Sequence, residues 1–334
     1  MTIKDIARES GYSVGTVSRT LNDQPGVSDK ARKRIMEVVN KYNFQLNQNA
    51  QHLKKQSKDG IAIIIKGTQN MLFSSIVEKM QSFIKQRGYN STIYYFSEDD
   101  NEINQAITIC RERKPYGILF LGSNLEYFEK SFKNIDIPCT LVTNSASELG
   151  FDNLSSVTTN DEAAAKYAIE HLINLGHTNI GILGGHRGTS YSAQNRWKGI
   201  DAAFKEYNID FDEETSYEES YFNISEGYRA TERLLDRNKN ITAIFAMADV
   251  LAIGAVRAIT DNGLKVPDDI SVIGFDGIDI ADYYFPRITT ISQQRDRIAA
   301  RSVEILVNAI EFETSAIHEI VPFYLTPGES VKRI

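Results

Sequence analysis

The chain has 334 residues, of which 42% are hydrophobic and 24% charged, and its formal net charge is −7. This length exceeds what one hydrophobic core usually serves, so we expect two or more domains in an ordinary globular protein. The N-terminus lacks the apolar core of a signal peptide, and no apolar run reaches the roughly 18 residues of a membrane span. Cys110 and Cys139 have no metal-binding spacing, so we expect reduced structural thiols in a cytoplasmic protein.

The charge is distributed unevenly along the chain. Residues 1–58 contain 11 lysines and arginines against 5 acids, a net charge of +6, whereas the remaining residues contain 26 against 39, a net charge of −13. A small basic segment joined to a large acidic one indicates a polyanionic partner for the basic segment alone. Charge by itself leaves open a second interpretation, in which this segment is merely a solvated terminus.

The first 40 residues predict three short helices. Thr2 begins a capping pattern for the first helix, and Gly11 ends it in a turn that requires positive φ. Ser13 can cap a second helix, in which Val17 and Leu21 face inward. Two short helices joined by a glycine-containing turn form a helix-turn-helix. A third helix begins at Ser28 and keeps four apolar residues on one face, namely Ala31, Ile35, Val38 and Val39.

The second predicted helix carries residues suited to a DNA groove. Its outward positions near the N-terminal half, the part that a recognition helix presents to bases, are Val14, Gly15, Ser18 and Arg19. Arg19 can donate two hydrogen bonds to guanine, and the small Gly15 permits close approach. Short donors for phosphates are Ser13, Thr16, Ser18 and Asn22. These features predict binding to double-stranded DNA, and a three-helix bundle of another purpose is the alternative.

From residue 61 onward, strand-like apolar runs alternate with segments of helical length. Strands are predicted over 61–66, 92–96, 117–121, 139–143, 180–184, 241–246 and 271–275, and helices over 74–87, 162–175, 195–207, 225–237 and 250–262. Such alternation predicts an α/β fold of parallel sheets, here in two successive doubly wound lobes. Ligands of such folds bind outside the carboxyl ends of the strands, so we expect a site in the cleft between the lobes.

Several motifs in the first 53 residues belong together. They are IKDIA at 3–7, GYSVGTVSR at 11–19, LN at 21–22, VS at 27–28 with Arg32 and Ile35, and NQNAQHL at 47–53. They closely resemble the head of the lac-repressor (LacI/GalR) family, and the last motif resembles that family's hinge helix, over about residues 47–55. The resemblance implies that Leu53 wedges between base pairs and that Ala50 lets two hinge helices meet. The chain departs from the family at Leu46, where proline is usual.

Together, the helix pattern and the resemblance predict one set of DNA contacts. The set is Thr2, Ser13, Val14, Gly15, Thr16, Ser18, Arg19, Asn22, Ser28, Asn47, Ala50 and Leu53. They all lie within residues 1–58, which we therefore predict to form a helix-turn-helix DNA-binding domain with a hinge helix.

The resemblance extends through the remaining chain. It rests on GH at 176–177, IGILGG at 180–185, NRWKG at 195–199, AIF at 243–245, ISVIGFD at 270–276 and PRITTI at 286–291. These motifs are similar to the family's effector-binding core, a fold like that of periplasmic sugar-binding proteins. The resemblance implies an effector-binding and dimerisation domain over 60–334, with a first lobe of 60–157 and 289–320 and a second of 158–288 and 321–334. The short tail after Val321 lacks leucine heptads, so we expect a homodimer.

The resemblance also implies which residues hold the ligand. Arg196 matches an arginine that forks onto effector hydroxyls, Asp276 an acid that accepts from others, and Phe222 an aromatic against the apolar face. The full predicted set is Phe73, Ser74, Thr143, Ser192, Arg196, Phe222, Asp249 and Asp276. An ion pair remains the alternative for Arg196 and Asp276, and core packing for the two phenylalanines. Ala248 and Thr143 replace hydrogen-bonding residues of many relatives, so we expect a ligand with fewer polar contacts or one held differently.

These observations predict a sequence-specific transcriptional regulator, a repressor, controlled by a small carbohydrate effector and needing no cofactor. An enzyme is disfavoured because HExxH, GxSxG and Walker motifs are missing, and GGHRG at 184–188 does not match GxGxxG. A transport binding protein would need a signal peptide and would not use a basic head. Control by a corepressor, such as a purine or sugar phosphate, or by a protein partner stays open.

Overall fold

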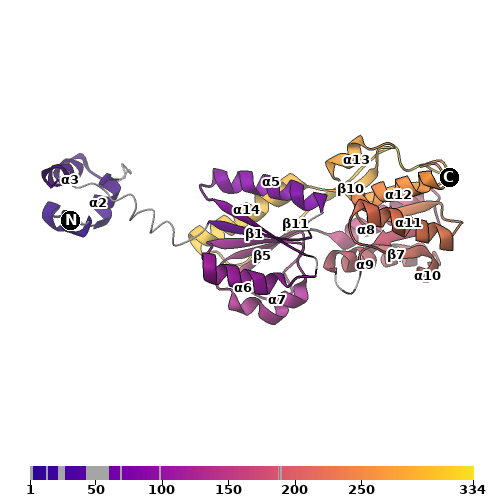
Figure 1. Cartoon of the computed structure of the whole chain (residues 1–334), viewed down its shortest axis with the longest axis horizontal. Helices are drawn as coiled ribbons and strands as arrows, with labels where there is room; N and C mark the ends of the chain where they lie inside the picture. The colour runs from indigo at the N-terminus through magenta and orange to yellow at the C-terminus, as the bar shows by residue number, and fades with distance from the viewer. Residues whose placement is uncertain are drawn as a thin grey trace. The chain divides into compact units, whose positions relative to one another are not determined.

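The computed structural model describes residues 3–12, 14–21, 27–42, 60–67, 70–97, 99–186, 188 and 190–334. Contacts divide the chain into two units, Met1–Ser57 (the head) and Lys58–Ile334 (the body). Figure 1 labels their elements. No helix within the described ranges combines the length and the apolar character needed to cross a membrane.

The head contains three helices, α1 (Ile3–Ser10), α2 (Val14–Leu21) and α3 (Asp29–Lys41). They pack around a small apolar core of Ile6, Ala7, Val17, Ile35, Val38 and Val39. Gly11 has a φ of 78° in the turn between α1 and α2, and its N–H donates to the Ala7 carbonyl at 3.0 Å. Ser28 caps α3 by accepting a hydrogen bond from the Ala31 N–H. The predicted helix-turn-helix is confirmed.

The first lobe of the body is a six-stranded parallel sheet between two pairs of helices. Its strands, in the order β11-β5-β4-β3-β1-β2, are β1 (Ile61–Lys66), β2 (Ser91–Phe96), β3 (Gly117–Leu121), β4 (Cys139–Val142), β5 (Leu154–Thr159) and β11 (His318–Val321). One face carries α5 (Met71–Gln86) and α14 (Arg295–Phe312). The other carries α6 (Glu102–Arg113), α7 (Leu125–Ser131) and the 3-10 turn η1 (Phe132–Asn134). Covered faces explain why every β1 residue is buried.

The second lobe repeats this plan. Its strands, in the order β12-β10-β9-β8-β6-β7, are β6 (Ile180–Gly184), β7 (Tyr217–Glu219), β8 (Ala243–Ala246), β9 (Ser271–Asp276), β10 (Thr289–Gln293) and β12 (Phe323–Thr326). Its helices are α8 (Asp161–Asn174), α9 (Tyr191–Glu206), α10 (Glu213–Ser216), α11 (Ile224–Arg237), α12 (Asp249–Asp261) and α13 (Asp279–Tyr283). The pair α8 and α9 covers one face, and the pair α11 and α12 covers the other. Only β12 pairs antiparallel among these strands.

The chain passes between the two sheets three times, after β5, β10 and β11. The predicted lobe boundary at residue 289 is wrong, because Thr289–Gln293 pairs with β9 in the second sheet. The chain therefore crosses only after Gln293, to form α14 of the first lobe. The resemblance alone placed the boundary at 289, and the segment TTISQ at 289–293, with a single apolar residue, has no local pattern that distinguishes between two sheets of the same type.

Candidate functional site

The predicted DNA contacts fall into two groups. Those outside the described residues are Thr2, Ser13, Asn22, Asn47, Ala50 and Leu53. Those within them are Val14, Gly15, Thr16, Ser18 and Arg19, which lie in α2, and Ser28, which caps α3. Lys30, Lys33 and Arg34 are exposed in the first half of α3, so a cationic surface follows the predicted recognition helix in the chain. The same surface suits phosphate contacts.

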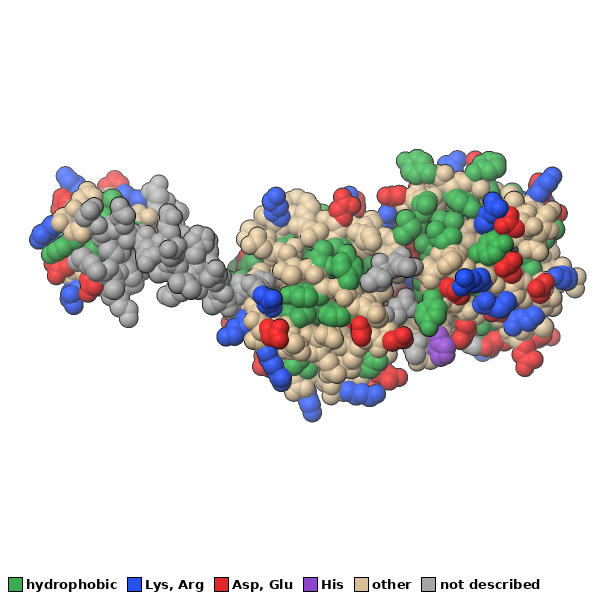
Figure 2. Space-filling model, viewed as in Figure 1, with side chains coloured by type: hydrophobic (Ala, Val, Ile, Leu, Met, Phe, Trp, Pro, Cys, Tyr) green, Lys and Arg blue, Asp and Glu red, His purple; other side chains and the backbone are tan. Residues whose placement is uncertain are grey.

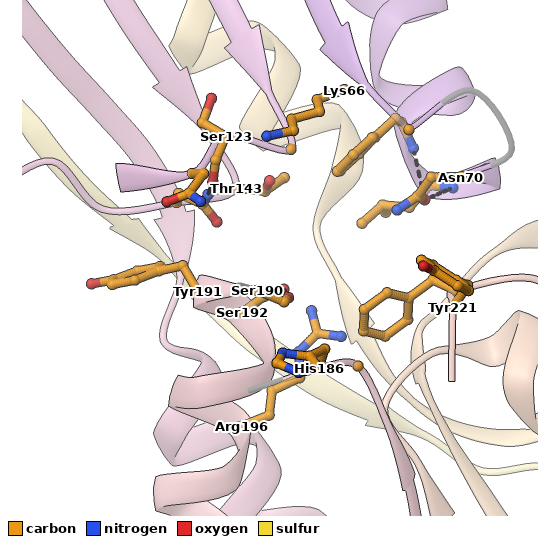
Figure 3. A pocket seen from close by; sticks show the side chains of 18 of the residues that line it. Lys66, Asn70, Ser123, Thr143, His186, Ser190, Tyr191, Ser192, Arg196 and Tyr221 are labelled. Atoms are coloured by element: carbon orange, nitrogen blue, oxygen red, sulfur yellow. Dashed lines mark hydrogen bonds between the residues drawn. The ribbon is translucent and has the colours of Figure 1, made fainter. Parts of the chain in front are cut away.

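A cavity of about 520 Å³ lies in the body where the carboxyl ends of strands from both sheets meet. Lys66 and Thr143 line it from the first lobe, at the ends of β1 and β4, and His186 and Asp276 line it from the second, at the ends of β6 and β9. Figure 3 shows Lys66 and Thr143 on one side of the cavity and His186 and Arg196 on the other. This is where doubly wound sheets bind ligands, and the volume lies within the roughly 300–1,000 Å³ typical of small-molecule sites.

Two lining residues have a backbone conformation that side chains seldom adopt. Thr143 has a φ of 74° and Asp276 a φ of 111°, and each stands at the end of a buried strand. Hydrogen bonds hold the Thr143 backbone, because its N–H donates to the Val157 carbonyl at 2.9 Å and its carbonyl accepts from Thr158 Oγ1 at 2.8 Å. Positive φ at a non-glycine residue costs energy and gathers at functional sites, so these turns mark the cavity rim.

Arg196 forms the charged floor of the cavity. Its side chain is buried, and its Nε donates to Asp161 Oδ1 at 2.8 Å. A second nitrogen donates to the Met247 carbonyl, and a third lies 3.6 Å from Asp276 Oδ1. The guanidinium also stacks 3.8 Å from the Phe275 ring centroid. Arg196 therefore does form the ion pair that the sequence left open as an alternative. The pair holds the guanidinium in place, and Arg196 still lines the cavity.

Asp276 carries a perturbed carboxyl group. Burial raises its pKa from the usual 3.8 to about 6, although Arg196 and a hydrogen bond from Gln293 Nε2 at 2.8 Å oppose the shift. Burial also raises the pKa of Asp161, again against Arg196. Both carboxylates therefore lie in surroundings that disfavour their charge, which a ligand with hydroxyl donors would offset.

This shift predicts a pH dependence of stability. A raised folded-state pKa contributes stability below the unfolded pKa, near 3.8, and that stability is lost as pH rises through about 6. We expect Asp276 to contribute a fall of up to roughly 3 kcal/mol in the free energy of unfolding between pH 4 and 7, since one pKa unit is about 1.4 kcal/mol. Urea unfolding across this range should show a shallower fall in Asp276→Asn. The exposed Asp282→Asn should keep the parent slope, and equal slopes in both variants would contradict the assignment.

Lys66 and Glu102 form a second buried ion pair, in the first lobe. Lys66 Nζ lies 3.1 Å from Glu102 Oε2, with 7% and 0% of the two side chains exposed. Glu102 Oε1 also accepts from the Asn124 N–H at 2.6 Å, and the Lys66 ammonium lies 4.8 Å from the Tyr127 ring centroid. Burial raises the pKa of Glu102, whereas Lys66 lowers it. Lys66, Asn124 and Tyr127 all line the cavity.

Aromatic side chains from both lobes complete the lining, namely Phe73, Tyr127, Tyr191, Tyr221 and Phe222. Asn70 fixes the start of α5, because its side chain accepts from the Leu72 and Phe73 N–H groups at 3.0 and 3.4 Å. Gly185 leaves room for Phe222, since a Cβ there would lie 2.5 Å from the phenyl ring. Aromatic faces with a few polar groups suit amphipathic ligands such as sugars.

Six of the residues predicted to hold a ligand line the cavity, and two do not. Those that line it are Phe73, Thr143, Ser192, Arg196, Phe222 and Asp276. Ser74 is exposed on α5, one helical position past Phe73, and its hydroxyl donates to the Asn70 carbonyl. Asp249 is completely buried, and its carboxylate accepts from Thr290 Oγ1 at 2.5 Å and the Ile278 N–H at 2.8 Å. Ser74 and Asp249 therefore stand outside the cavity lining, and the Asp249 carboxylate instead joins the start of α12 to Thr290 and to the Ile278 backbone.

The sequence interpretation missed several lining residues. They include Lys66, Asn70, Ser123, Asn144, Tyr191 and Gln293. One signal could have found Lys66, because it is the polar last residue of an otherwise apolar strand. Among the described residues, Ser123 Oγ and Ser220 Oγ are buried without a hydrogen-bond partner, and both residues line the cavity. No described group of three or more His, Cys, Asp or Glu side chains could hold a metal ion.

Comparisons with known proteins place the chain in a family. Residues 2–47 match the lacI family of bacterial regulatory proteins, and residues 169–331 match a periplasmic binding protein-like domain. The regulator MalR of Clostridium butyricum is 35% identical over 335 residues, 99% of each chain, and the repressor PurR of Vibrio campbellii is 31% identical over 93% of this chain and 92% of its own. The lac repressor dimer bound to operator and the anti-inducer ONPF has the same fold, with a TM-score of 0.76 and 24% identity over 99% of each chain. The helix-turn-helix head, the two-lobed body and these relatives together show that the chain is a transcriptional regulator of the lacI family.

Proposed function

We propose that this regulator binds operator DNA through α2 and represses transcription, and that a small sugar-like effector in the interlobe cavity controls this binding. The observation that carries the proposal is the joining of a helix-turn-helix head to a body whose cavity is lined from both lobes. We assign DNA binding to residues 1–58 and effector binding and dimerisation to residues 60–334. We propose that the protein is not an enzyme, and that it acts in the cytoplasm because it must reach the chromosome.

The effector is proposed to contact the six cavity-lining residues predicted from the sequence. Arg196 and Asp276 supply a charged donor and a charged acceptor on one wall, and Phe222 supplies an apolar face. Two structural neighbours support a sugar-like ligand. The structure of the regulator CelR in complex with cellobiose matches this chain with a TM-score of 0.72 and 22% identity. The lac repressor has been solved bound to ONPG. Their folds cover 99% of this chain.

Control requires two arrangements of the lobes that differ in effector affinity. Because the cavity is lined from both lobes, a ligand there favours the arrangement in which both walls reach it. The first lobe follows the head in the chain, so its movement would change how the heads meet DNA. Such coupling is reciprocal, so operator DNA must change effector affinity by the factor by which effector changes operator affinity.

We propose that two copies pair through an apolar face of the body. Figure 2 shows apolar side chains gathered over α12 and α13. Tyr283 and Phe285 are each 88% exposed, and a groove of about 540 Å³ lined by Met71, Ile224 and six further residues joins both lobes. Exposed apolar surface of this kind marks protein contacts. The lac repressor neighbour is itself a dimer on its operator.

The DNA-binding role is tested by Arg19→Ala. We expect the variant to lose about 1–3 kcal/mol of binding free energy for a duplex selected from random sequences, and to relax discrimination at one base pair. Fluorescence anisotropy at fixed salt would measure both effects, since phosphate contacts make affinity fall with salt. Lys205→Ala removes an exposed cation of α9 and should leave the affinity unchanged. Parental discrimination in Arg19→Ala would refute the recognition-helix assignment.

A further inference from the structure

The Lys66–Glu102 pair occupies an unusual place for two charges. Its side chains are almost completely buried, yet Lys66 lines the cavity. A buried ion pair is typically no more stabilising than apolar residues of the same volume, so stability alone does not account for it. Glu102 is held from two sides, by Lys66 and by the Asn124 N–H at 2.6 Å, which gives the ammonium a fixed position in the wall. Figure 3 shows Lys66 facing the cavity from the side opposite Arg196.

The charges around the cavity are unfavourable for an anionic ligand. Among the described lining residues, the cations are Lys66 and Arg196, and the acids are Asp99, Glu219, Glu226 and Asp276. Each of these two cations already has a buried carboxylate partner, Glu102 for Lys66 and Asp161 for Arg196. A phosphate monoester carries about −1.5 to −2 charges at pH 7, and would meet two acid-compensated cations and an excess of acids. Like charges across an interface suppress the wrong partner.

We propose that Lys66 is a specificity-determining residue of the effector site, and that the effector is an uncharged sugar. The ammonium, held in place by Glu102, donates a hydrogen bond to one sugar hydroxyl from the first-lobe wall, while Arg196 donates from the second. The pair remains neutral as a unit, so it favours a hydroxyl and gives a phosphate ester no net attraction. This inference rests on the proposed function, because it names the ligand class and a contact of the same cavity.

Calorimetric titration of the full chain with matched probes tests the inference. The probes are glucose, maltose and cellobiose, each beside its 6- or 6′-phosphate, followed by singly deoxygenated analogues of the tightest-binding sugar. We expect at least one neutral sugar to bind roughly tenfold or more tightly than its phosphate. A tenfold difference in Kd corresponds to only about 1.4 kcal/mol, which repulsion between the phosphate and the cavity acids can supply. One deoxy analogue should bind roughly 10- to 100-fold more weakly than its parent sugar, because the charged donor is left unpaired.

The double variant Lys66→Gln/Glu102→Gln keeps a hydrogen-bonding pair of similar size and leaves no buried charge unpaired. We expect it to bind the neutral sugar about tenfold more weakly, and to bind the sensitive deoxy analogue and the parent sugar alike. The control is Lys130→Gln/Glu126→Gln, the same chemical change in an exposed pair on α7. It should behave as the parent chain does in every titration. Thermal unfolding of both variants confirms that they fold.

Three results would overturn the inference, and they separate it from the proposed function. A phosphate ester that binds more tightly than its neutral sugar would refute the uncharged ligand and leave effector control standing. A double variant that keeps parental affinity and the same deoxy loss would refute the role of Lys66 alone. Absence of binding by every probe, with operator binding intact, would refute control by a sugar and this inference with it.

Discussion

Replacing Arg196 by methionine is expected to abolish effector binding and to lower the free energy of unfolding by about 3–5 kcal/mol, the usual cost of breaking a buried ion pair from one side. The physical reason is that Arg196 is the cationic partner of two buried carboxylates, at 2.8 Å from Asp161 and 3.6 Å from Asp276. Their mutual repulsion would then be unopposed in a site that already disfavours their charge. Urea unfolding measures the loss of stability, and calorimetric titration with the tightest-binding sugar measures the loss of affinity.

Two further variants separate the two effects. Asp161→Asn combined with Arg196→Met removes one unpaired carboxylate, so it should recover part of the stability without recovering ligand binding. Arg233 pairs with Glu218, but 48% of the Arg233 side chain is exposed. Arg233→Met should therefore change the free energy of unfolding by less than about 1 kcal/mol. Parental affinity in Arg196→Met would show that the guanidinium does not contact the effector.

A second large effect is expected at the crossing of α11 and α12. Gly254 of α12 is so close to α11 that a Cβ would lie 2.3 Å from the Ile224 carbonyl oxygen and 2.5 Å from the Tyr228 nitrogen. Gly227 of α11 is equally close to α12, because a Cβ on Gly227 would lie 2.7 Å from the Leu251 Cα. Because these neighbours are backbone atoms, neither helix can yield locally. We expect Gly254→Val to lower the free energy of unfolding by about 3 kcal/mol or more.

The comparison that isolates crowding uses Gly88. It follows α5 with a φ of 79° and has nothing within 4 Å of a Cβ, so Gly88→Ala should cost only about 1–2 kcal/mol, through its backbone conformation. Gly254→Ala should already be destabilising although alanine favours a helix over glycine by about 1 kcal/mol. Thermal and urea unfolding of the three variants would rank them. A Gly254→Val protein as stable as the parent would contradict the close helix crossing.

Much of the architecture could be predicted because it depends on local patterns. The spacing of Gly11, Val17 and Ile35 indicates the helix-turn-helix, because small helices must bury their few apolar residues on one face. The β1, β3 and β6 strands have the predicted bounds, since both faces of a parallel sheet are buried and such strands are continuously apolar. The helices predicted over 162–175, 225–237 and 250–262 have both ends within one residue of those of α8, α11 and α12.

The lining of the proposed effector site was predictable only in part. A resemblance of motifs led to Arg196, Asp276 and Phe222, and all three line the cavity. The same reasoning placed Asp249 there, although its carboxylate accepts from Thr290 and from the backbone beyond β9. A carboxylate at the start of a helix has the same sequence signature whether it faces a ligand or a neighbouring loop. Its orientation depends on elements 29 and 41 residues away along the chain.

The amino-acid sequence by itself determined the class of protein, because local periodicity, the charge difference between head and body, and short motifs are all properties of neighbouring residues. Only the tertiary structure decided which strand joins which sheet, as for Thr289–Gln293, and which charges meet. Lys66 and Glu102 lie 36 residues apart, and Asp161 and Arg196 lie 35 apart. The energy of a buried charge depends on what surrounds it in space, and sequence order does not specify that environment.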